Sequence, residues 1–363
     1  MTAGATPRSH GAIDEGFWAG RRVLVTGHTG FKGAWLALWL ESLGASVSGL
    51  SLDPPSSPSL HDLVGAPASP PVDVRDAAAV LAAVEAARPS VVFHLAAQPL
   101  VRRSYVDPAQ TFAVNVQGTA NVLDAARAGG GVGAVVVVTS DKCYEPHDGE
   151  FGHRETDPLG GRDPYSASKA AAELVCAAYR ASFAMPLATA RAGNVIGGGD
   201  WGEDRLLPDV MDAALTGAPV ELRSPDAIRP WQHVLNPLAG YLVLAQAVAA
   251  DAATFAGPWN FGPGVEEALP VRALVARLGE LWGREIPAAT QPGEHPPETA
   301  TLRLDSTRAR VHLGWRPLWS LDEGLQAIVD WYRAYDRKAD LRDTTLAQIA
   351  AYEAAARRDR ELA

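Results

Sequence analysis

Two side chains in the segment DPYSASKAAAE (163–173) have types and a spacing that suit proton transfer. Tyr165 and Lys169 lie four positions apart, and such positions share one face of a helix, so the phenol and the ammonium point the same way. A nearby cation favours the phenolate and lowers the pKa of a tyrosine from its ordinary value of about 10. A phenolate tuned in this way could take a proton from an alcohol while hydride leaves the same carbon.

A second reactive cluster ends the apolar run VVVVTSDKCY (135–144). The valines give way to the hydroxyl of Ser140, the carboxyl group of Asp141 and the amine of Lys142. An adjacent acid and base suit an elimination, in which Lys142 would take a proton from carbon and Asp141 would protonate the leaving hydroxyl. This chemistry requires burial and neighbouring charges to shift both pKa values towards neutrality.

A glycine-rich segment, TGHTGFKG, precedes both clusters in the chain. Gly27 allows a tight turn, Gly30 lets the backbone approach a pyrophosphate, and Gly33 lets the following helix pack on the preceding strand. The N-terminus of that helix then faces the anion. The spacing predicts a dinucleotide site that includes Gly27, Gly30, Phe31, Lys32 and Gly33.

The choice between NAD and NADP depends on the residues that follow the second expected strand. Ser51 and Asp53 lie there, while Lys32 could attract a 2′-phosphate, and we favour NAD. Asp73 and Val74 end a short third strand and are placed to meet the adenine, although they could also be a solvated strand end.

These residues need a scaffold, and the alternation of short β-rich runs with helical patterns indicates an α/β fold. The class we expect is a Rossmann-type doubly wound parallel sheet with a smaller C-terminal substrate-binding lobe, because near-continuous apolar strands joined by helices are typical of parallel sheets. Such sheets bind ligands beyond the carboxyl ends of their strands. The strands are expected in 21–27, 45–52, 71–74, 91–97, 134–140, 187–196 and 259–261.

The domain boundaries follow from the same pattern. We expect a disordered tail, a NAD-binding Rossmann domain with a strand that returns to it, a lobe that is mainly substrate-binding, and a C-terminal helix or tail. In that order the ranges are 1–18, 19–196 with 259–263, 197–345 and 346–363.

Composition restricts the partners. The formal net charge of -10 disfavours binding to nucleic acid, whose phosphates would be repelled. We find no run that is long and apolar enough to cross a membrane. Cys143 and Cys176 are the only cysteines and form no disulfide framework, and no Cys/His spacing suggests a metal site. These features predict a cytoplasmic, metal-independent protein.

The glycine loop, the strand-end Ser140 and the Tyr165–Lys169 pair together resemble the extended short-chain dehydrogenase/reductase family. The resemblance implies that Ser140 bonds the substrate hydroxyl or Tyr165, and that Lys169 binds the nicotinamide ribose. Asp141 and Lys142 resemble the nucleotide-sugar dehydratase branch. Because lysine stands where many of these dehydratases carry glutamate, the resemblance favours CDP-glucose as the nucleotide-sugar substrate.

The same resemblance implies further contacts and an assembly. One group lines the nicotinamide side, a second supports the sugar or cofactor pocket, and a third contacts the nucleotide diphosphate or base. The first group is Ala96, Ala97 and Gln98. The second is Asn194, together with Gln98 and Ser140. The third is Arg205, Arg229 and His233. The resemblance also implies a homodimer through helices near 108–128 and 164–183, whereas His94, inside a strand pattern, is expected in the core.

Other interpretations remain open. An epimerase also oxidises C4 of a nucleotide sugar but needs no elimination acid, and a dehydratase could act on another nucleotide hexose. A different class is a non-catalytic protein that senses a nucleotide sugar or NAD(H). The segment PETATLRLD (297–305) stands where the family has a histidine-rich segment. This difference concerns the contacts around the nucleotide and therefore which nucleotide the substrate carries.

Overall fold

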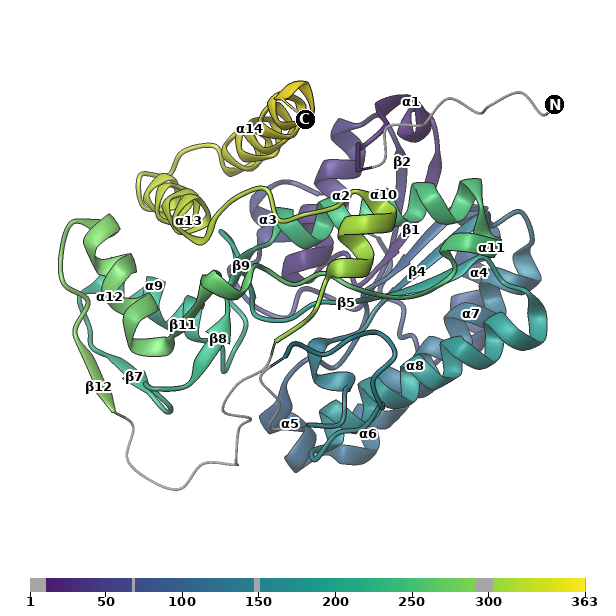
Figure 1. The fold of residues 1–363 in the computed structure, drawn as a ribbon, viewed down its shortest axis with the longest axis horizontal. Helices are drawn as coiled ribbons and strands as arrows, with labels where there is room; N and C mark the ends of the chain where they lie inside the picture. Colours follow the sequence, from purple (N-terminus) through teal and green to yellow (C-terminus); the bar gives the residue numbers. More distant parts are fainter. Residues whose placement is uncertain (1–10, 67–68, 147–150, 291–302, 363) are drawn as a thin grey trace.

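A six-stranded, fully parallel sheet forms the centre of the molecule in the computed structural model, which describes residues 11–66, 69–146, 151–290 and 303–362 (Figure 1). The strand order is β10-β5-β4-β3-β1-β2. The bounds are β1 Arg22–Thr26, β2 Ser46–Leu50, β3 Val91–His94, β4 Ala134–Val138, β5 Leu187–Arg191 and β10 Gly257–Asn260. The expected Rossmann-type sheet is confirmed.

The strand predicted at 71–74 is absent, and the prediction was wrong. This stretch is irregular, and the Val72 amide makes a single backbone bond, to the Ser51 carbonyl at 2.8 Å. Pro70 and Pro71 have no N–H to donate to a ladder, which disfavours a strand here. Asp73 and Val74 therefore end a loop beside β2.

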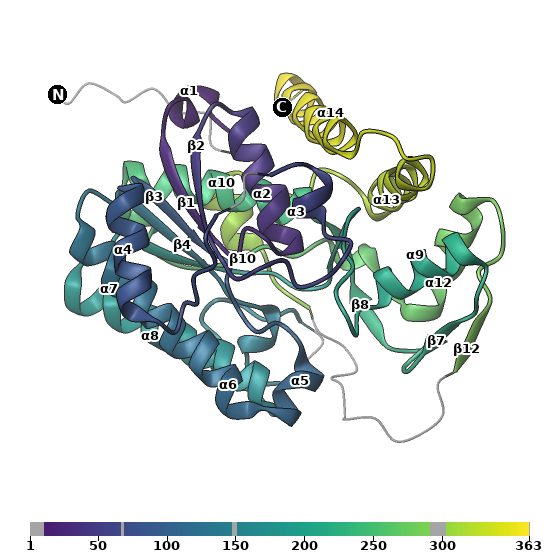
Figure 2. The ribbon, with the colours of Figure 1, turned by 180° about the vertical axis from the view of Figure 1, so that it is seen from behind.

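Helices cover both faces of the sheet (Figure 2). Successive β1 residues alternate between two cores, since Val23 and Val25 pack on one side and Leu24 packs on the other. The first side carries α2 (Phe31–Ser42) and α10 (Leu235–Ala250), and the second carries α4 (Ala77–Ala87), α7 (Gly118–Gly129) and α8 (Pro164–Phe183). Although α10 lies in the range expected for the lobe, it packs against β4 and β5.

The chain reverses direction across the sheet beside β1. It runs from β1 outward to the edge strand β2, and then returns to β3 on the other side of β1. Parallel sheets open a crevice at such a switch point, beyond the carboxyl ends of the strands. This position is where the glycine loop follows β1.

A smaller lobe lies beside the carboxyl edge of the sheet (Figure 1). It contains two-stranded pairs that are flanked by helices, and the short pair β6–β9 connects it to the main body. The elements are β6 Val195–Ile196, α9 Leu206–Thr216, β7 Val220–Leu222, β8 Ile228–Pro230, β9 Gln232–His233, β11 Ala268–Pro270, α12 Val271–Trp282 and β12 Ala288–Thr290.

The remaining helical elements are short connections, together with two helices near the C-terminus. Their bounds are α1 Glu15–Trp18, α3 Leu60–Leu63, α5 Val101–Val106, α6 Pro108–Phe112, η1 Ala113–Gln117, η2 Asp141–Cys143, α11 Ala252–Phe255, η3 Val265–Glu267, η4 Ala309–Leu313, α13 Leu321–Asp336 and α14 Leu341–Leu362. Within the described ranges, no helix has the length and apolar character needed to cross a membrane.

Both ends of the described chain pack on the main body. The tail expected at 1–18 is too long, because Trp18 is buried and its indole N–H donates to Gln246 Oε1 at 2.8 Å. Residues 1–10 lie outside the described part. At the other end, α14 lies against α2, where the Trp39 indole N–H donates to Glu353 Oε1 at 2.7 Å.

Candidate active site

One cleft at the carboxyl edge of the sheet contains both reactive clusters and the glycine loop. Its volume is about 870 Å³, near the upper end of the range of about 300–1,000 Å³ that is common for ligand sites. Ser140, Asp141 and Lys142 line it together with Tyr165 and Lys169. The cleft therefore brings together all the residues for which the sequence predicted chemistry.

The glycine loop has the close approaches that a dinucleotide cradle requires. Gly27 has φ +75, and a Cβ there would lie 2.7 Å from the Ala96 amide nitrogen. A Cβ on Gly33 would lie 2.1 Å from the Gly27 carbonyl oxygen, so α2 can approach β1 only with glycine at this position. Gly30 caps α2 without a side-chain bond, which leaves amides at the helix N-terminus for an anion. These features fit a pyrophosphate.

The other residues predicted to bind the cofactor also line the cleft: Phe31, Lys32, Ser51, Asp73, Val74, Ala96, Ala97 and Gln98. The Ser51 hydroxyl is hydrogen-bonded to His28 Nδ1 at 2.9 Å, and Asp73 is held by Arg75 at 2.6 Å. Burial lowers the pKa of Lys32 to about 8. The set therefore spans the distance from the end of β2 to the reactive residues.

Tyr165 and Lys169 lie one turn apart on α8, as expected. The helix begins at Pro164, and the Asp163 carboxylate accepts a hydrogen bond from the Ser166 amide at 2.9 Å. Lys169 Nζ donates to the Val138 carbonyl at 3.3 Å, and burial lowers the Lys169 pKa to about 8.

The pKa of Tyr165 differs from the prediction. Burial raises it to about 12, and this effect outweighs a hydrogen bond with Ser140, which acts to lower it. The phenol is therefore neutral at ordinary pH in this structure.

The acid–base pair follows β4 on a single 3-10 turn. The Ser140 hydroxyl donates to Asp141 Oδ1 at 3.0 Å and accepts from the Lys142 amide at 3.2 Å. Burial raises the pKa of Asp141, although the positive charge of Lys142 acts to lower it. Gly193 makes room for this carboxyl group, because a Cβ there would lie 1.7 Å from Asp141 Oδ2. A carboxylic acid that keeps its proton can act as a donor.

Five of the six residues predicted to bind substrate line the cleft, namely Gln98, Ser140, Asn194, Arg205 and Arg229. Asn194 Nδ2 donates to Asp141 Oδ2 at 3.4 Å, and the positive charge of Arg229 acts to lower the Asp141 pKa. Arg205 donates to both carboxylate oxygens of Asp200, at 3.0 and 3.1 Å. The arginines place positive charge beside the reactive residues.

The two histidines that were considered from sequence both lie in the core. His94 lies between Thr26 and Thr119, at 2.7 and 3.1 Å, as expected for a core residue. His233 is buried against Trp35 and Trp319 and does not line the cleft, so its predicted contact with the nucleotide is wrong. Burial is the main cause that lowers both histidine pKa values to about 3.

Asn115 is a buried polar residue that the sequence analysis missed. Its side chain accepts from the Gln98 amide at 2.8 Å and donates to the Gln98 carbonyl at 3.1 Å and to Ser168 Oγ at 2.9 Å. It lies in the π-helical turn η1, inside a stretch that reads as one helix. The Gln98 side chain is itself hydrogen-bonded to Leu100 and Thr111, so it stabilises the loop between β3 and α5.

Two charged clusters were also missed. Beneath the cleft, Glu173 and Arg191 form a buried ion pair with an N–O distance of 2.8 Å. At the edge of the cleft, Asp204 accepts from Arg102 at 2.8 Å and from Arg223 at 3.2 Å. Their partners are far apart in sequence, and neither cluster forms a local motif.

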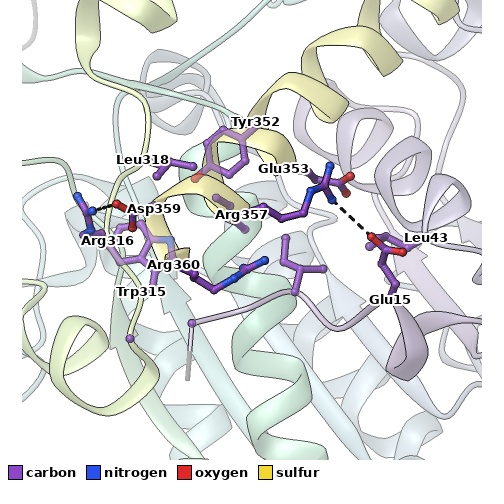
Figure 3. A pocket seen from close by; sticks show the side chains of 15 residues that line it. Glu15, Leu43, Trp315, Arg316, Leu318, Tyr352, Glu353, Arg357, Asp359 and Arg360 are labelled. Atoms are coloured by element: carbon purple, nitrogen blue, oxygen red, sulfur yellow. Dashed lines mark hydrogen bonds and ion pairs between the residues drawn. The ribbon is translucent and has the colours of Figure 1, made fainter. Parts of the chain in front are cut away.

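A second cavity, of about 130 Å³, lies between α14 and the N-terminal segment (Figure 3). Its rim carries ion pairs, including Arg357 with Glu15 at 3.6 Å and Arg316 with Asp359. It contains none of the reactive residues. In the described part of the chain, no group of three or more His, Cys, Asp or Glu side chains is placed to hold a metal ion.

Known proteins resemble this chain over most of its length. The model of the NAD dependent epimerase/dehydratase family matches residues 23–257. The CDP-glucose 4,6-dehydratase of Salmonella typhimurium (strain LT2) is 45% identical over 358 residues, which cover 95% of this chain and 100% of that protein. The UDP-glucose 4-epimerase of Mycolicibacterium smegmatis is 32% identical, with coverage of 86% and 98%. The crystal structure of a dTDP-glucose 4,6-dehydratase from Streptomyces venezuelae with NAD bound aligns with a TM-score of 0.73 at 26% identity and covers 88% of this chain and 99% of its own.

Proposed function

The chain belongs to the NAD-dependent epimerase/dehydratase family, and we propose that it is a 4,6-dehydratase that converts CDP-glucose to CDP-4-dehydro-6-deoxyglucose. It uses NAD. The observation that carries the proposal is the position of Asp141 and Lys142. They line the same cleft as Tyr165, beside a glycine loop that fits a dinucleotide. The CDP-glucose dehydratase relative covers almost the whole chain, which supports this choice of nucleotide.

In the first stage Tyr165 acts as the base. Its oxygen takes the proton of the sugar's 4-hydroxyl, while Ser140 hydrogen-bonds the same oxygen and Lys169 holds the ribose of the cofactor. Bound NAD would supply the acceptor for the hydride of C4 and the donor for its return to C6, together with a positive charge that would favour the phenolate. That charge would offset the burial that keeps Tyr165 neutral in the cleft.

In the second stage Asp141 and Lys142 remove water. The 4-keto group acidifies the proton on C5, and the amine of Lys142 takes it. Asp141, whose pKa burial raises, gives its proton to the departing 6-hydroxyl. The departing hydroxyl and the proton from Asp141 form the water, whereas Lys142 keeps the C5 proton and returns it to C5 when the hydride adds to C6. The pair must therefore reach both carbons from one side of the sugar.

The nucleotide is bound by the arginines beside the floor of the cleft. Arg205 and Arg229 line the cleft and would bond the diphosphate, because a planar guanidinium can bond two oxygens of the same phosphate. Asn194 would orient the sugar through its contact with Asp141. The cofactor would be held by the glycine loop, by Ser51, and by the residues at 73–74 and 96–98.

A 4-epimerase is the second candidate, since the mycobacterial epimerase is 32% identical to this chain. An epimerase oxidises C4 reversibly but has no use for an acid at position 141. Asp141→Asn keeps the shape and removes the proton donor. We expect this variant to lose about 10²–10⁴-fold in dehydration while it still forms NADH transiently. Full 4-epimerase activity in the variant would favour the alternative.

A panel of nucleotide sugars tests the substrate. Enzyme and NAD are incubated separately with CDP-, dTDP-, UDP- and GDP-glucose, and the 4-keto product is followed by its absorbance in alkali. We expect product from CDP-glucose at the highest kcat/KM. Turnover of another nucleotide alone would change the substrate, and no product from any of the four would exclude a dehydratase.

We further propose a cytoplasmic homodimer. Leu174 and Phe183 on α8 and Phe112 on α6 are 61%, 50% and 39% exposed, and large exposed apolar side chains on neighbouring helices are typical of an interface. The buried, unpaired Cys143 and Cys176 are compatible with a reducing compartment. Sedimentation analysis would show a single dimeric species, and a monomer at micromolar concentration would contradict the assembly.

A further inference from the structure

Both ends of the segment that carries the acid–base pair are anchored to one buried ion pair. Before the pair, the Thr139 hydroxyl donates to Glu173 Oε1 at 2.5 Å. After the pair, Arg191 Nη1 donates to the Tyr144 hydroxyl at 2.8 Å. Residues 140–143 span the gap between these two anchors.

The hydrogen bonds of the Glu173–Arg191 ion pair hold both side chains rigidly. Arg191 Nε donates to Glu173 Oε1 at 3.0 Å and Nη2 donates to Oε2 at 2.8 Å, which is the paired geometry of a guanidinium on a carboxylate. The Thr189 hydroxyl adds a bond to Oε2 at 2.7 Å, so each carboxylate oxygen accepts two bonds. The two side chains are 3% and 1% exposed, and charges at this depth persist only when they are fully bonded.

The second anchor is fixed just as firmly. The Tyr144 hydroxyl donates to Asn260 Oδ1 at 2.6 Å, and the Tyr144 ring stacks on His153 with centroids 4.6 Å apart. Asn260 ends β10, the edge strand of the sheet, and Arg191 ends β5 beside it. The end of the reactive segment is therefore tied to two strands of the sheet.

Glu173 connects this ion pair to Tyr165 and Lys169, the residues proposed for the oxidation stage. It lies on α8 one turn beyond Lys169, which is one turn beyond Tyr165, so the three side chains share a helix face. We propose that Glu173, Arg191, Thr139 and Tyr144 form a clamp that positions the acid–base pair against the tyrosine base. The clamp touches neither substrate nor reacting atoms in this scheme, and its members are positioning residues. The inference rests on the proposed dehydratase function.

The clamp acts unequally on the two stages of the reaction. Tyr165 and Lys169 are held by α8 itself, and Lys169 also by the Val138 carbonyl. The turn that carries Asp141 and Lys142 is only three residues long, and the two anchors add to the backbone bonds that flank it, from the Thr139 amide to the Ala190 carbonyl and from the Gly160 amide to the Cys143 carbonyl. Loosening an anchor should therefore slow the elimination more than the oxidation, because small misplacements of a catalytic group can cost about 10²-fold in rate.

Two threonines give a matched pair of variants. Thr139→Val and Thr189→Val each remove one hydroxyl that donates to Glu173, and each keeps the side-chain shape. Only Thr139 adjoins the reactive turn, whereas Thr189 lies within β5. Thr139→Ser keeps the hydroxyl and tests whether the bond itself is what matters.

The first measurement is amide hydrogen exchange of residues 140–145 in the full-length protein, which needs no turnover. We expect exchange about tenfold faster in Thr139→Val, and near the wild-type rate in Thr189→Val and Thr139→Ser. Equal exchange of this segment in Thr139→Val and wild type would overturn the clamp. Equal acceleration in both valine variants would also overturn it, because the effect would then be a general loss of stability.

The second measurement is single-turnover kinetics with CDP-glucose, in which NADH absorbance reports the oxidised intermediate. We expect Thr139→Val to slow the decay of NADH about tenfold or more while its formation changes little. Equal slowing of formation and decay would refute the unequal action of the clamp. If wild-type enzyme turned over none of the nucleotide sugars, the proposed function would fail, and hydrogen exchange would still decide whether the clamp exists.

Discussion

The floor and the mouth of the cleft use charged side chains in opposite ways. We call Ser140, Asp141, Tyr165 and Lys169, with the Glu173–Arg191 pair beneath them, the floor. The mouth consists of Arg102, Asp204 and Arg223. In the floor pair the side chains are 3% and 1% exposed, and every carboxylate oxygen has two donors. In the mouth the three side chains are 44%, 34% and 22% exposed, and two arginines share one carboxylate.

This difference separates chemistry from recognition. Floor groups cannot change partners without leaving a buried charge unpaired, so their positions are fixed, as proton transfer requires. Mouth groups exchange partners at little cost, because water and salt compete for exposed ion pairs. A diphosphate bound by Arg205 and Arg229 could therefore also replace Asp204 on Arg102 or Arg223, and its entry would not disturb the floor.

Loss of Tyr165, the proposed base in the floor, should have the largest effect on kcat. We expect Tyr165→Phe to lower kcat about 10³–10⁴-fold, because it removes the group that takes the hydroxyl proton and leaves the ring in place. Neither NADH nor product should accumulate. The check is a steady-state assay with CDP-glucose and NAD, and a variant within tenfold of wild type would assign the base elsewhere.

The second-largest effect should be on stability, because breaking the ion pair of the floor should cost more free energy of unfolding than breaking those of the mouth. Glu173→Gln breaks the floor pair and leaves Arg191 without its buried partner, so we expect a loss of about 3–5 kcal/mol in the free energy of unfolding. Asp204→Asn breaks exposed pairs of the mouth and should cost at most about 1 kcal/mol. Urea unfolding of both variants makes the comparison, and equal losses would contradict it.

Substrate affinity should respond to the mouth. Arg223→Ala removes a guanidinium that can bind a phosphate, and we expect KM for CDP-glucose to rise about tenfold while kcat changes little. The increase should shrink at high salt, since the charge is partly exposed and salt screens it. Matching decreases in kcat and kcat/KM would instead place Arg223 in the chemical step.

Acid should destabilise the protein by the smallest amount, through His94 in the core of the sheet. Burial is the main cause that lowers the pKa of His94 to about 3, and an unfolded histidine titrates near 6.5. Between these values the unfolded chain binds a proton that the native protein does not. Stability is therefore lost as pH falls below about 6.5, by up to about 1.4 kcal/mol per pH unit for this residue. Urea unfolding at pH 7.5 and 5.5 measures the loss, and His94→Gln should lessen it.

The floor could be predicted from sequence because its reactive residues fall in short contiguous motifs. Tyr165 and Lys169 are one helical turn apart, and Ser140 to Lys142 directly follow a strand. The mouth could not, since Arg102, Asp204 and Arg223 come from three distant segments. The Glu173–Arg191 pair was missed for the same reason, although Glu173 continues the spacing of Tyr165 and Lys169.

The errors in the prediction have physical causes. Pro70 and Pro71 removed the expected third strand, because they cannot donate to a ladder. His233 was assigned to the nucleotide through the resemblance to the family, but tertiary packing buries it against Trp35 and Trp319. The Tyr165 pKa depends on burial, which spacing along a helix does not report.

Isotope labelling tests most directly whether this cleft carries out an internal oxidation, elimination and reduction. CDP-glucose with deuterium at C4 is converted by the wild-type enzyme, and the product is examined by nuclear magnetic resonance. We predict a 4-keto-6-deoxy product in which the deuterium has moved to C6, with no net reduction of NAD. Deuterium that remains at C4 of a recovered or epimerised hexose would contradict the dehydratase assignment.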